Sequence, residues 1–399
     1  TRTQGLPVSP SHVLWPLGLG TALSLMGDAS LYTVLPTHTA DAGVALGSVG
    51  VLLGANRAIR LLLNGPAGLA YDRYPRRHLF VPSLFIGALS TALYAATRGF
   101  WPLLAARLLW GLAGSGIWVG GATMILDVAA SEERGRWTGL YQTWFFLGTT
   151  AGSLSGGFLT DRLGYAATMW IGAVLTALGG LAALVCLPET RSARRPASGA
   201  ALAATGAGEL ALGGNGALWV AVLQQGVSRF VGAGVLSAIL GLIVRDLLQP
   251  FTLGWGIATL TGILAAGRTV LSMAAAPLGG TVSDRLGSRW GVMAWAMTGG
   301  LVGMLLMAWN APAAIVVGVL LGAASAGCVQ SLATTLTGDL VSPRQRGRAI
   351  GLLHTAGDLG SAIGPIVAYA LLPWLGLRGV YLLCALVLAA SLVPALLTK

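Results

Sequence analysis

Seven charged side chains stand inside long apolar stretches of this sequence, where charge is costly and therefore informative. They are Asp28, Arg57, Arg60, Arg107, Arg229, Arg268 and Asp358, with His354 near the start of the stretch that holds Asp358. At about 2.5–3.5 kcal/mol each, seven unpaired charges within a membrane would cost roughly 20 kcal/mol. That exceeds the roughly 5–15 kcal/mol by which a fold is usually stable. These groups must pair or line water, and their chemistry would be proton exchange and the binding of charged solutes.

Further polar residues recur beside these charges at helical spacing, in steps of three, four or seven residues. The stripes are Ser24, Asp28 and Tyr32; Asn56, Arg60 and Asn64, with Arg57 beside them; Gln225 and Arg229; Thr261, Arg268 and Ser272; and His354, Asp358 and Ser361. We expect every stripe to face one central cavity.

Asp28 is the first candidate for proton exchange. It lies about as deep in its apolar run as Arg57 does in the next, so we expect an ion pair of Asp28 with Arg57 or Arg60. Two interpretations stay open: a permanent pair that fixes helix packing, and a carboxyl that exchanges a proton as the cavity changes access. Asp358 with His354 is the second candidate, because histidine titrates near neutral pH. His354 can equally be a packing residue.

The balance of buried charge bears on the substrate. Five arginines face two aspartates, so an anionic or zwitterionic solute would supply the missing counter-charge, with Arg229 and Arg268 as its ligands. The competing interpretation gives arginines to backbone carbonyls and leaves an aromatic pocket for drug-like molecules. Aromatic and amide candidates for the lining are Tyr32, Trp118, Tyr141, Trp144, Phe145, Phe146, Asn56, Asn64, Gln224, Gln225 and Gln330.

The elements that position these residues must lie in lipid. Apolar residues make up 55% of the 399 positions and charged residues 9%, and the mean hydropathy is +0.76. A soluble chain carries about 25% charge, because water must wet its surface. The 59 glycines suit close helix packing within a membrane. The three cysteines sit in apolar runs without metal or disulfide spacing.

Twelve apolar runs are long enough to span a bilayer. They lie near 13–36, 46–71, 79–97, 101–127, 138–160, 166–188, 217–244, 253–282, 290–310, 312–340, 349–373 and 379–397. A polar stretch rich in Arg, Ala and Gly interrupts them in the middle. We therefore expect an all-α membrane protein with a first six-helix bundle at 1–188, a cytoplasmic linker at 189–216 and a second bundle at 217–399.

The net charge of +11 reflects topology and does not indicate nucleic-acid binding. With the N-terminus in the cytoplasm, fifteen basic residues fall on the cytoplasmic side, four fall outside and five fall within spans. This asymmetry follows the positive-inside rule. It predicts a multi-pass protein of the inner membrane with both termini in the cytoplasm.

The two halves repeat at an offset of 212 residues. PAGLAYDR matches PLGGTVSDR, and ERGRWTGLYQ matches QRGRAIGLLH. Residues related by this offset include Asp72 and Asp284, Arg73 and Arg285, Asp127 and Asp339, Gly148 and Gly360, and Gly152 and Gly364. Such repeats are typical of secondary transporters, in which the substrate binds between the repeats near the middle of the membrane.

The repeated segments also resemble a known family. GPAGLAYDRYPRR resembles the G-x-x-x-D-R-x-G-R-R loop signature of the major facilitator superfamily, and Arg107 with Gly111, Gly114 and Gly116 resembles its second motif. GTTAGSLSGG resembles the fifth-span motif of its proton antiporters, with Ser153 in place of proline. The resemblance covers essentially the whole chain and implies the twelve-helix major facilitator fold. It also implies proton transfer for Arg107, whereas the residue alone is equally compatible with a tie to a backbone carbonyl.

The loop motif predicts a gate at the cytoplasmic surface. Asp72 ends a helix and can accept from the N–H groups that begin a neighbouring helix, such as the eleventh span near Arg348. Arg73 and Arg77 are expected to pair with Asp127. The counterparts in the second half are Asp284, Arg285 and Asp339. Such a latch must break as the halves rock, and Arg76 is expected to be only an interfacial anchor.

Enzymatic function finds no support, because the sequence has no nucleotide-binding P-loop, no zinc spacing and no nucleophile–base pair in a credible context. We expect no cofactor and no metal. The prediction is a monomeric secondary transporter that exports drug-like or amphiphilic solutes against proton entry, most like the drug:proton antiporters. The alternatives are a carrier for organic anions or lipid-like amphiphiles, by symport, exchange or flipping, and a non-transporting receptor with the same fold.

Overall fold

The computed structural model describes residues 9–130, 133–191, 215–248, 254–342 and 345–398. Helices make up most of this part of the chain, which contains no β-strand. Within lipid, an apolar run can satisfy its own backbone N–H and C=O groups only as a helix, which is why these runs fold as they do. The all-α prediction is confirmed. The linker residues 192–214, and the basic residues Arg2, Arg194, Arg195, Arg344 and Lys399, lie outside the described residues.

The first half contains six long helices. They are α1 (Pro10–Val34), α3 (Val49–Arg73), α4 (Arg76–Ala96), α5 (Phe100–Val128), α6 (Arg134–Leu163) and α7 (Tyr165–Cys186). The short elements α2 (Thr39–Ala42) and η1 (Leu46–Ser48) connect α1 to α3. We call the end of the molecule at which α1 begins the terminal face, and the end at which α2 and η1 lie the far face.

The second half begins with a continuous helical stretch that changes its winding twice. It comprises α9 (Gly216–Arg229), the π-helical turn η4 (Phe230–Leu236), α10 (Ser237–Ile243) and a second π-helical turn η5 (Val244–Leu248). The remaining helices are α11 (Ile257–Leu286), α12 (Arg289–Ala308), α13 (Pro312–Leu340) and α14 (Arg346–Leu397).

Helix α14 unites the last two predicted spans. Its two arms meet at Gly376, whose φ of +62° lies in the left-handed region that favours glycine. Nine stretches of the described residues are long and apolar enough to cross a membrane, and α14 supplies the last of them. Helices α1 and α6, of 25 and 30 residues, are also long enough to span a bilayer. With α14 counted as two arms, this is consistent with twelve spans.

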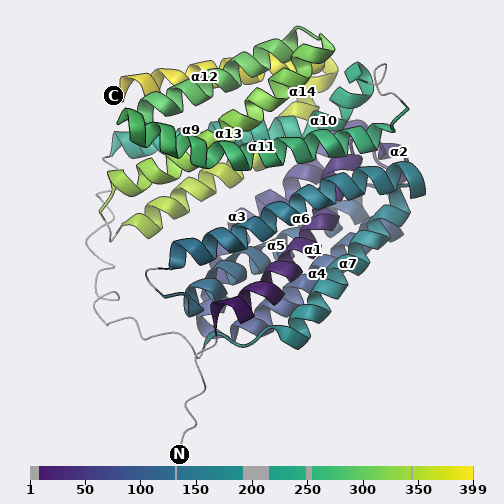
Figure 1. The fold of residues 1–399 in the computed structure, drawn as a ribbon. Helices are drawn as coiled ribbons and strands as arrows, with labels where there is room; N and C mark the ends of the chain where they lie inside the picture. Colours follow the sequence, from purple (N-terminus) through teal and green to yellow (C-terminus); the bar gives the residue numbers. More distant parts are fainter. Residues whose placement is uncertain (1–8, 131–132, 192–214, 249–253, 343–344, 399) are drawn as a thin grey trace, which may run out of the picture.

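The helices pack as two groups, which Figure 1 shows in purple to teal and in green to yellow. In the first group α1 packs on α6 and α7, and α5 packs on α3 and α4. In the second group α14 packs on α9 and α12, and α13 packs on α11 and α12. The two groups meet chiefly where α6 lies against α11 and α3 against α14. The predicted boundaries at 188 and 217 remain a prediction.

Glycines bring the two halves together near the far face. A methyl group on Gly50 or Gly54 of α3 would overlap the carbonyl oxygen of Pro365 or Ala362 on α14. A methyl group on Gly157 of α6 would likewise overlap the backbone of α11. Small residues permit this close approach of helix backbones, which is how helices associate when no water drives them together.

Candidate functional site

A cavity of about 410 Å³ lies between the two halves. Its size falls within the range of roughly 300–1,000 Å³ that small-molecule sites occupy. The predicted residues that line it are Asp28, Tyr32, Arg57, Arg60, Asn64, Trp118, Gln225, Arg229, Arg268, Gln330, His354 and Asp358. They come from helices of both halves, so the polar stripes do converge on one space.

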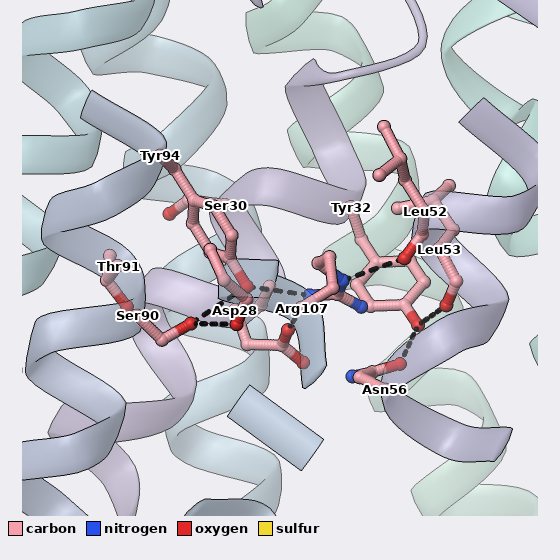
Figure 2. Close-up of polar contacts among 12 residues, drawn as sticks. Asp28, Ser30, Tyr32, Leu52, Leu53, Asn56, Ser90, Thr91, Tyr94 and Arg107 are labelled. Carbon is pink, nitrogen blue, oxygen red and sulfur yellow. Dashed lines mark hydrogen bonds and ion pairs between the residues drawn. The ribbon is translucent and has the colours of Figure 1, made fainter. Parts of the chain in front are cut away.

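Five of the residues predicted for the site do not line this cavity: Arg107, Asn56, Tyr141, Trp144 and Gln224, whose side-chain nitrogen donates to the carbonyl of Ser391 at 2.5 Å. Arg107 is buried beneath Asp28 with 1% of its surface exposed. Asn56 is also buried, and its Oδ1 lies 3.1 Å from the hydroxyl of Tyr32 (Figure 2). Tyr141 is a packing residue: its hydroxyl lies 3.1 Å from Oγ1 of Thr21, and its ring fills the space that Gly121 leaves. The prediction that Asn56 and Tyr141 line the cavity was wrong, because their side chains turn toward neighbouring helices.

Asp28 pairs with Arg107, and not with Arg57 or Arg60 as the depth argument predicted. The Arg107 Nη1 donates to Oδ1 of Asp28 at 2.6 Å, and its Nε donates to the carbonyl of Leu52 at 2.9 Å (Figure 2). Matching depth was insufficient because α5 packs against both α1 and α3 and brings Arg107 between them. The alternative of a carbonyl tie for Arg107 therefore holds alongside its ion pair.

The two arginines on α3 reach across to the second half. The Arg57 Nη1 donates to the carbonyl of Ala233 at 2.9 Å. The Arg60 Nη2 lies 3.6 Å from Oδ2 of Asp358 on α14. Tyr32 contacts both Arg57 and Arg107, whose guanidinium carbons lie 5.2 Å and 4.9 Å from its ring centroid. The α3 arginines thus connect the halves, while the Asp28 pair lies within the first half.

A π-helical turn supplies the carbonyls that accept hydrogen bonds from Arg57 and Arg268. Both accepting carbonyls lie in or beside η4, whose π winding departs from the α-helical pattern of backbone hydrogen bonds, and such turns often occur at functional sites. Besides Ala233, the turn offers Gly232, whose carbonyl accepts from Nη2 of Arg268 at 2.8 Å. The Arg268 Nη1 also donates to Oγ of Ser237 at 3.3 Å. The sequence does not predict η4, because π winding has no local residue pattern of its own.

Arg229 stands at the end of α9, immediately before this turn. Within the described part of the chain, the guanidinium of Arg229 has no hydrogen-bond or ion-pair partner, and its Nε is buried. The carboxylates in the cavity lining are Asp28 and Asp358, and both already contact an arginine. His354 lies on the same face of α14 as Asp358 and also lines the cavity.

An aromatic wall from α5 and α6 lines another part of the cavity. Trp118 packs edge-on against Phe145 with ring centroids 5.1 Å apart, and Phe145 packs edge-on against Phe146 at 6.0 Å. Trp144 does not take part, because its ring packs over Gly18 and against Trp15. The cavity therefore offers an apolar wall as well as guanidinium groups, which suits an amphiphilic solute.

At the terminal face, Arg76 is the partner of Asp127. The Arg76 Nε donates to Oδ2 of Asp127 at 3.1 Å, and this arginine is 1% exposed. The prediction that Arg73 and Arg77 pair with Asp127, and that Arg76 is only an anchor, was wrong. The start of α4 turns Arg76 inward against α5, whereas the guanidinium of Arg77 donates to the carbonyl of Leu184.

The second half shows a related cluster with a different arginine. The Arg289 Nη1 lies 2.5 Å from Oδ2 of Asp339, and its Nη2 lies 3.8 Å from Oδ1 of Asp284. Arg289 was not among the predicted gate residues, although it is the counterpart of Arg77 at the 212-residue offset. Asp72, Arg73 and Arg285 remain predicted gate residues, as does the predicted contact of Asp72 with the start of α14.

Glu189 was missed by the sequence analysis. It follows α7, and its carboxylate accepts from the backbone N–H groups of Arg76 at 2.9 Å and Arg77 at 3.1 Å, which are free because α4 begins there. Burial acts to raise the pKa of Glu189. The backbone N–H groups of Arg191, Arg76 and Arg77 outweigh that effect, so the pKa of this carboxyl lies below its ordinary value.

Asp161 was also missed, and it joins the two halves at the far face. Its Oδ2 accepts from the backbone N–H of Thr259 at 2.6 Å and from Oγ1 of the same residue at 2.5 Å. Its Oδ1 lies 3.4 Å from the backbone nitrogen of Ala258. A carboxylate on α6 therefore caps the first turn of α11, where unpaired N–H groups and the helix dipole favour negative charge.

The sequence did contain a signal for Asp161. The segment GFLTDRLG, which ends at Gly164, has the spacing G-x-x-x-D-R-x-G, and GTVSDRLG, which ends at Gly287, repeats it. The same spacing up to the Asp-Arg pair occurs in GLAYDR. The pattern therefore marks helix ends at both faces of the molecule. The segment GFLTDRLG is not related to the other two by the 212-residue offset, so the repeat of the halves does not reveal it.

Two kinds of comparison place the chain among known proteins. The sequence profile of the Major Facilitator Superfamily matches residues 17–261 and residues 225–399. A class C tetracycline resistance protein of Escherichia coli is 26% identical over 382 residues, which cover 92% of this chain and 94% of that protein. A chloramphenicol resistance protein of Streptomyces lividans is 27% identical over 363 residues, which cover 88% and 87%.

Solved structures share the fold at lower identity. A bacterial homologue of the human lysosomal transporter Spinster, in an inward-facing and unoccupied conformation, has a TM-score of 0.80 at 18% identity, covering 98% of this chain and 97% of its own. The nucleoside transporter NupG has a TM-score of 0.75 at 16% identity, covering 96% and 98%. The chain is a multi-pass membrane transporter that belongs to the Major Facilitator Superfamily.

Proposed function

We propose that this protein exports small, drug-like or amphiphilic organic solutes across the cytoplasmic membrane in exchange for protons. The observation that carries the proposal is the cavity between the halves, which combines an aromatic wall with the carboxylates Asp28 and Asp358. The tetracycline and chloramphenicol resistance proteins that resemble the chain over most of its length support a solute of this kind. Gradient-driven transport by alternating access agrees with two repeated halves around one site.

Proton coupling requires titratable groups that the cavity exposes, and the two lining carboxylates meet that condition. Asp358 contacts Arg60 of the other half at 3.6 Å, so a proton on Asp358 would remove an attraction that holds the halves together. His354 lines the cavity beside it and is suited to pass the proton on. Asp28 contacts Arg107 within the first half, so its protonation would free a buried guanidinium.

The orientation follows from the distribution of basic residues. Fifteen of them assign the terminal face to the cytoplasm of an inner membrane, and the far face then lies outside. In this orientation the Asp161 cap and the glycine contacts near it belong to the external gate. The Asp127 and Asp339 clusters belong to the cytoplasmic gate. The protein would act as a monomer, since the cavity lies between the halves of one chain.

Transport in proteoliposomes tests the proposal, with tetracycline as the probe. An acidic lumen should drive tetracycline inward, and Asp358→Asn should abolish this accumulation while exchange of tetracycline without a pH gradient continues. Asp28→Asn should also lower accumulation. Asp41→Asn changes an exposed carboxylate in α2 and should leave accumulation unchanged. If Asp28→Asn and Asp358→Asn both retain full accumulation, the proposed coupling through these carboxylates is wrong.

A carrier for organic anions or lipid-like amphiphiles, working by symport, exchange or flipping, is the second candidate. The observation in its favour is the surplus of arginine in the cavity, where Arg57, Arg229 and Arg268 have no carboxylate partner among the described residues. Proton-driven accumulation separates the candidates. An exchanger or flippase would move its solute equally well without a pH gradient.

A further inference from the structure

The cavity presents more positive charge than the described residues neutralise. Four arginines line it, and the aspartates contact only one of them, Arg60. Arg57 and Arg268 each donate to a carbonyl of the π-helical turn, which leaves their charge uncompensated, and the Nε of Arg268 is buried without an acceptor among the described residues. Arg229 lacks even this, because its Nε is buried and no described residue accepts from it.

An unpartnered guanidinium within a membrane protein is expensive to maintain. Burying such a group costs several kcal/mol unless an anion or a set of acceptors meets it. Among the described residues, Arg57 and Arg60 repel Arg229 whereas Asp358 attracts it, so repulsion is part of this cost. A ligand that supplies an acceptor to the Arg229 guanidinium would offset this cost. Arg229 ends α9 immediately before η4, and it lines the cavity.

We propose that Arg229 binds an anionic group of the transported solute, a carboxylate in the first instance, with Arg57 as the second ligand. The apolar body of the same solute would lie against Trp118 and Phe145, which line the same cavity. A planar guanidinium matches a carboxylate with two parallel hydrogen bonds, so this site favours an anion over a neutral amide of the same shape. The inference rests on the proposed transport function and specifies its substrate as an amphiphilic organic anion.

Arg57 links this binding to the movement of the halves. In the structure its Nη1 donates to the carbonyl of Ala233, which is a neutral acceptor on the opposite half. A carboxylate is a stronger acceptor than a carbonyl, because the hydrogen bond then joins opposite charges. The bound anion would therefore replace this contact between the halves. Arg268 would keep its bond to Gly232 and hold the turn in place.

Thermal-shift measurements on the detergent-purified protein test the anion site. The probes share one ring system and differ in charge: 1-naphthoate, 1-naphthamide and 1-naphthylmethylammonium. A ligand of the folded state raises the melting temperature by mass action. We expect 1-naphthoate alone to raise it, with about tenfold to hundredfold weaker binding in Arg229→Gln, partial retention in Arg229→Lys, and no change in Arg378→Gln. Arg378 is exposed and does not line the cavity.

A second readout separates a ligand-binding arginine from a structural one. Without ligand, Arg229→Gln should melt at or above the wild-type temperature, because the variant removes an unpartnered charge and orphans no acceptor. A lower melting temperature of the unliganded variant would assign Arg229 to structure. Equal stabilisation by the three probes, no stabilisation by 1-naphthoate, or unchanged 1-naphthoate binding in Arg229→Gln would each overturn the anion site.

The proposed function and this inference fail differently in proteoliposomes. If 1-naphthoate binds through Arg229 but an acidic lumen does not drive its accumulation, the anion site stands and proton-coupled export is wrong. If the acidic lumen drives 1-naphthylmethylammonium while 1-naphthoate neither binds nor moves, proton-coupled export stands and the anion site is wrong.

Discussion

Asp28 on α1 and Arg107 on α5 form a hydrogen-bonded ion pair of 2.6 Å beneath the wall of the cavity. Arg107 is 1% exposed, and it also donates to the carbonyl of Leu52 on α3. One guanidinium thus joins three helices of the first half, while the partly exposed carboxylate of Asp28 faces the cavity. The pair therefore connects helix packing to the site at which solute and protons would arrive.

This pair should behave asymmetrically on mutation. Arg107→Gln leaves Asp28 without its cation and Leu52 without its donor, and breaking a buried pair from one side costs about 3–5 kcal/mol. In an Asp28→Asn background the same change should cost markedly less, because the carboxylate is already neutral. Thermal unfolding of the four proteins in detergent measures the difference. Additive losses would show that the two side chains are energetically independent.

Asp161 should hold the far face closed. Replacing it with Asn removes the negative charge that caps the first turn of α11, an interaction of about 1 kcal/mol, or about fivefold in the population of a conformation open at the far face. Spin labels at Arg98 and Arg378, both exposed near the far face, would report the distance between the halves.

For Asp161→Asn we expect a larger population of molecules with long distances between the two spin labels. Asp246→Asn is the matched control, because Asp246 lies near the same face and pairs at 2.6 Å with its neighbour Arg245 within η5, in its own half of the molecule. The exposed Cys186 must be replaced before labelling. Identical distance distributions for the wild type and Asp161→Asn would contradict the role of this cap in closure.

Arg76 should matter more for stability than Arg77. Arg76→Gln leaves Asp127, which is 8% exposed, without its ion pair, and we expect a loss of about 3 kcal/mol. Arg77→Gln removes a partly exposed bond to a carbonyl and should cost less than about 1 kcal/mol. Thermal unfolding of both variants in detergent distinguishes them. An equal or greater loss of stability for Arg77→Gln would favour the pair of Arg77 with Asp127 that the sequence alone predicted.

Glu189 should contribute stability only above acidic pH. Its pKa lies below the ordinary value of 4.5 in the folded protein, so its contribution is complete above that value. The contribution is lost as the pH falls through the folded-state pKa. The difference in melting temperature between the wild type and Glu189→Gln should therefore be constant above about pH 5 and shrink at lower pH.

A matched control for this pH dependence is Glu133→Gln at the start of α6. Glu133 is half exposed and lies 3.7 Å from Arg136. An exposed pair of this kind contributes little, so the melting temperature of Glu133→Gln should match the wild type across the same pH range. A Glu189→Gln difference that persists at low pH would show that the effect does not arise from the carboxylate charge.

The sequence by itself determined the elements and the general character of the site. Apolar runs of about twenty residues become helices because a helix satisfies the backbone N–H and C=O groups of such a run from within the run itself. The cost of charge in lipid requires residues such as Asp28, Arg229 and Asp358 to turn away from it, and their helical spacing placed them on common faces. The repeat at 212 residues predicted two related halves, and the two glycine-lined contacts between α3 and α14 and between α6 and α11 join them.

Only the tertiary structure decided which charges meet. Position along a helix predicts depth at about 1.5 Å per residue, but it does not specify which helix lies beside which. That is why depth predicts a pair of Asp28 with Arg57 or Arg60 whereas Asp28 meets Arg107, and why Asp127 meets Arg76. The carbonyls of Gly232 and Ala233, which accept from Arg268 and Arg57, belong to the π-helical turn η4, and π winding has no local residue pattern of its own. The Asp161 cap joins residues about a hundred positions apart, which become neighbours only when the two halves pack against each other.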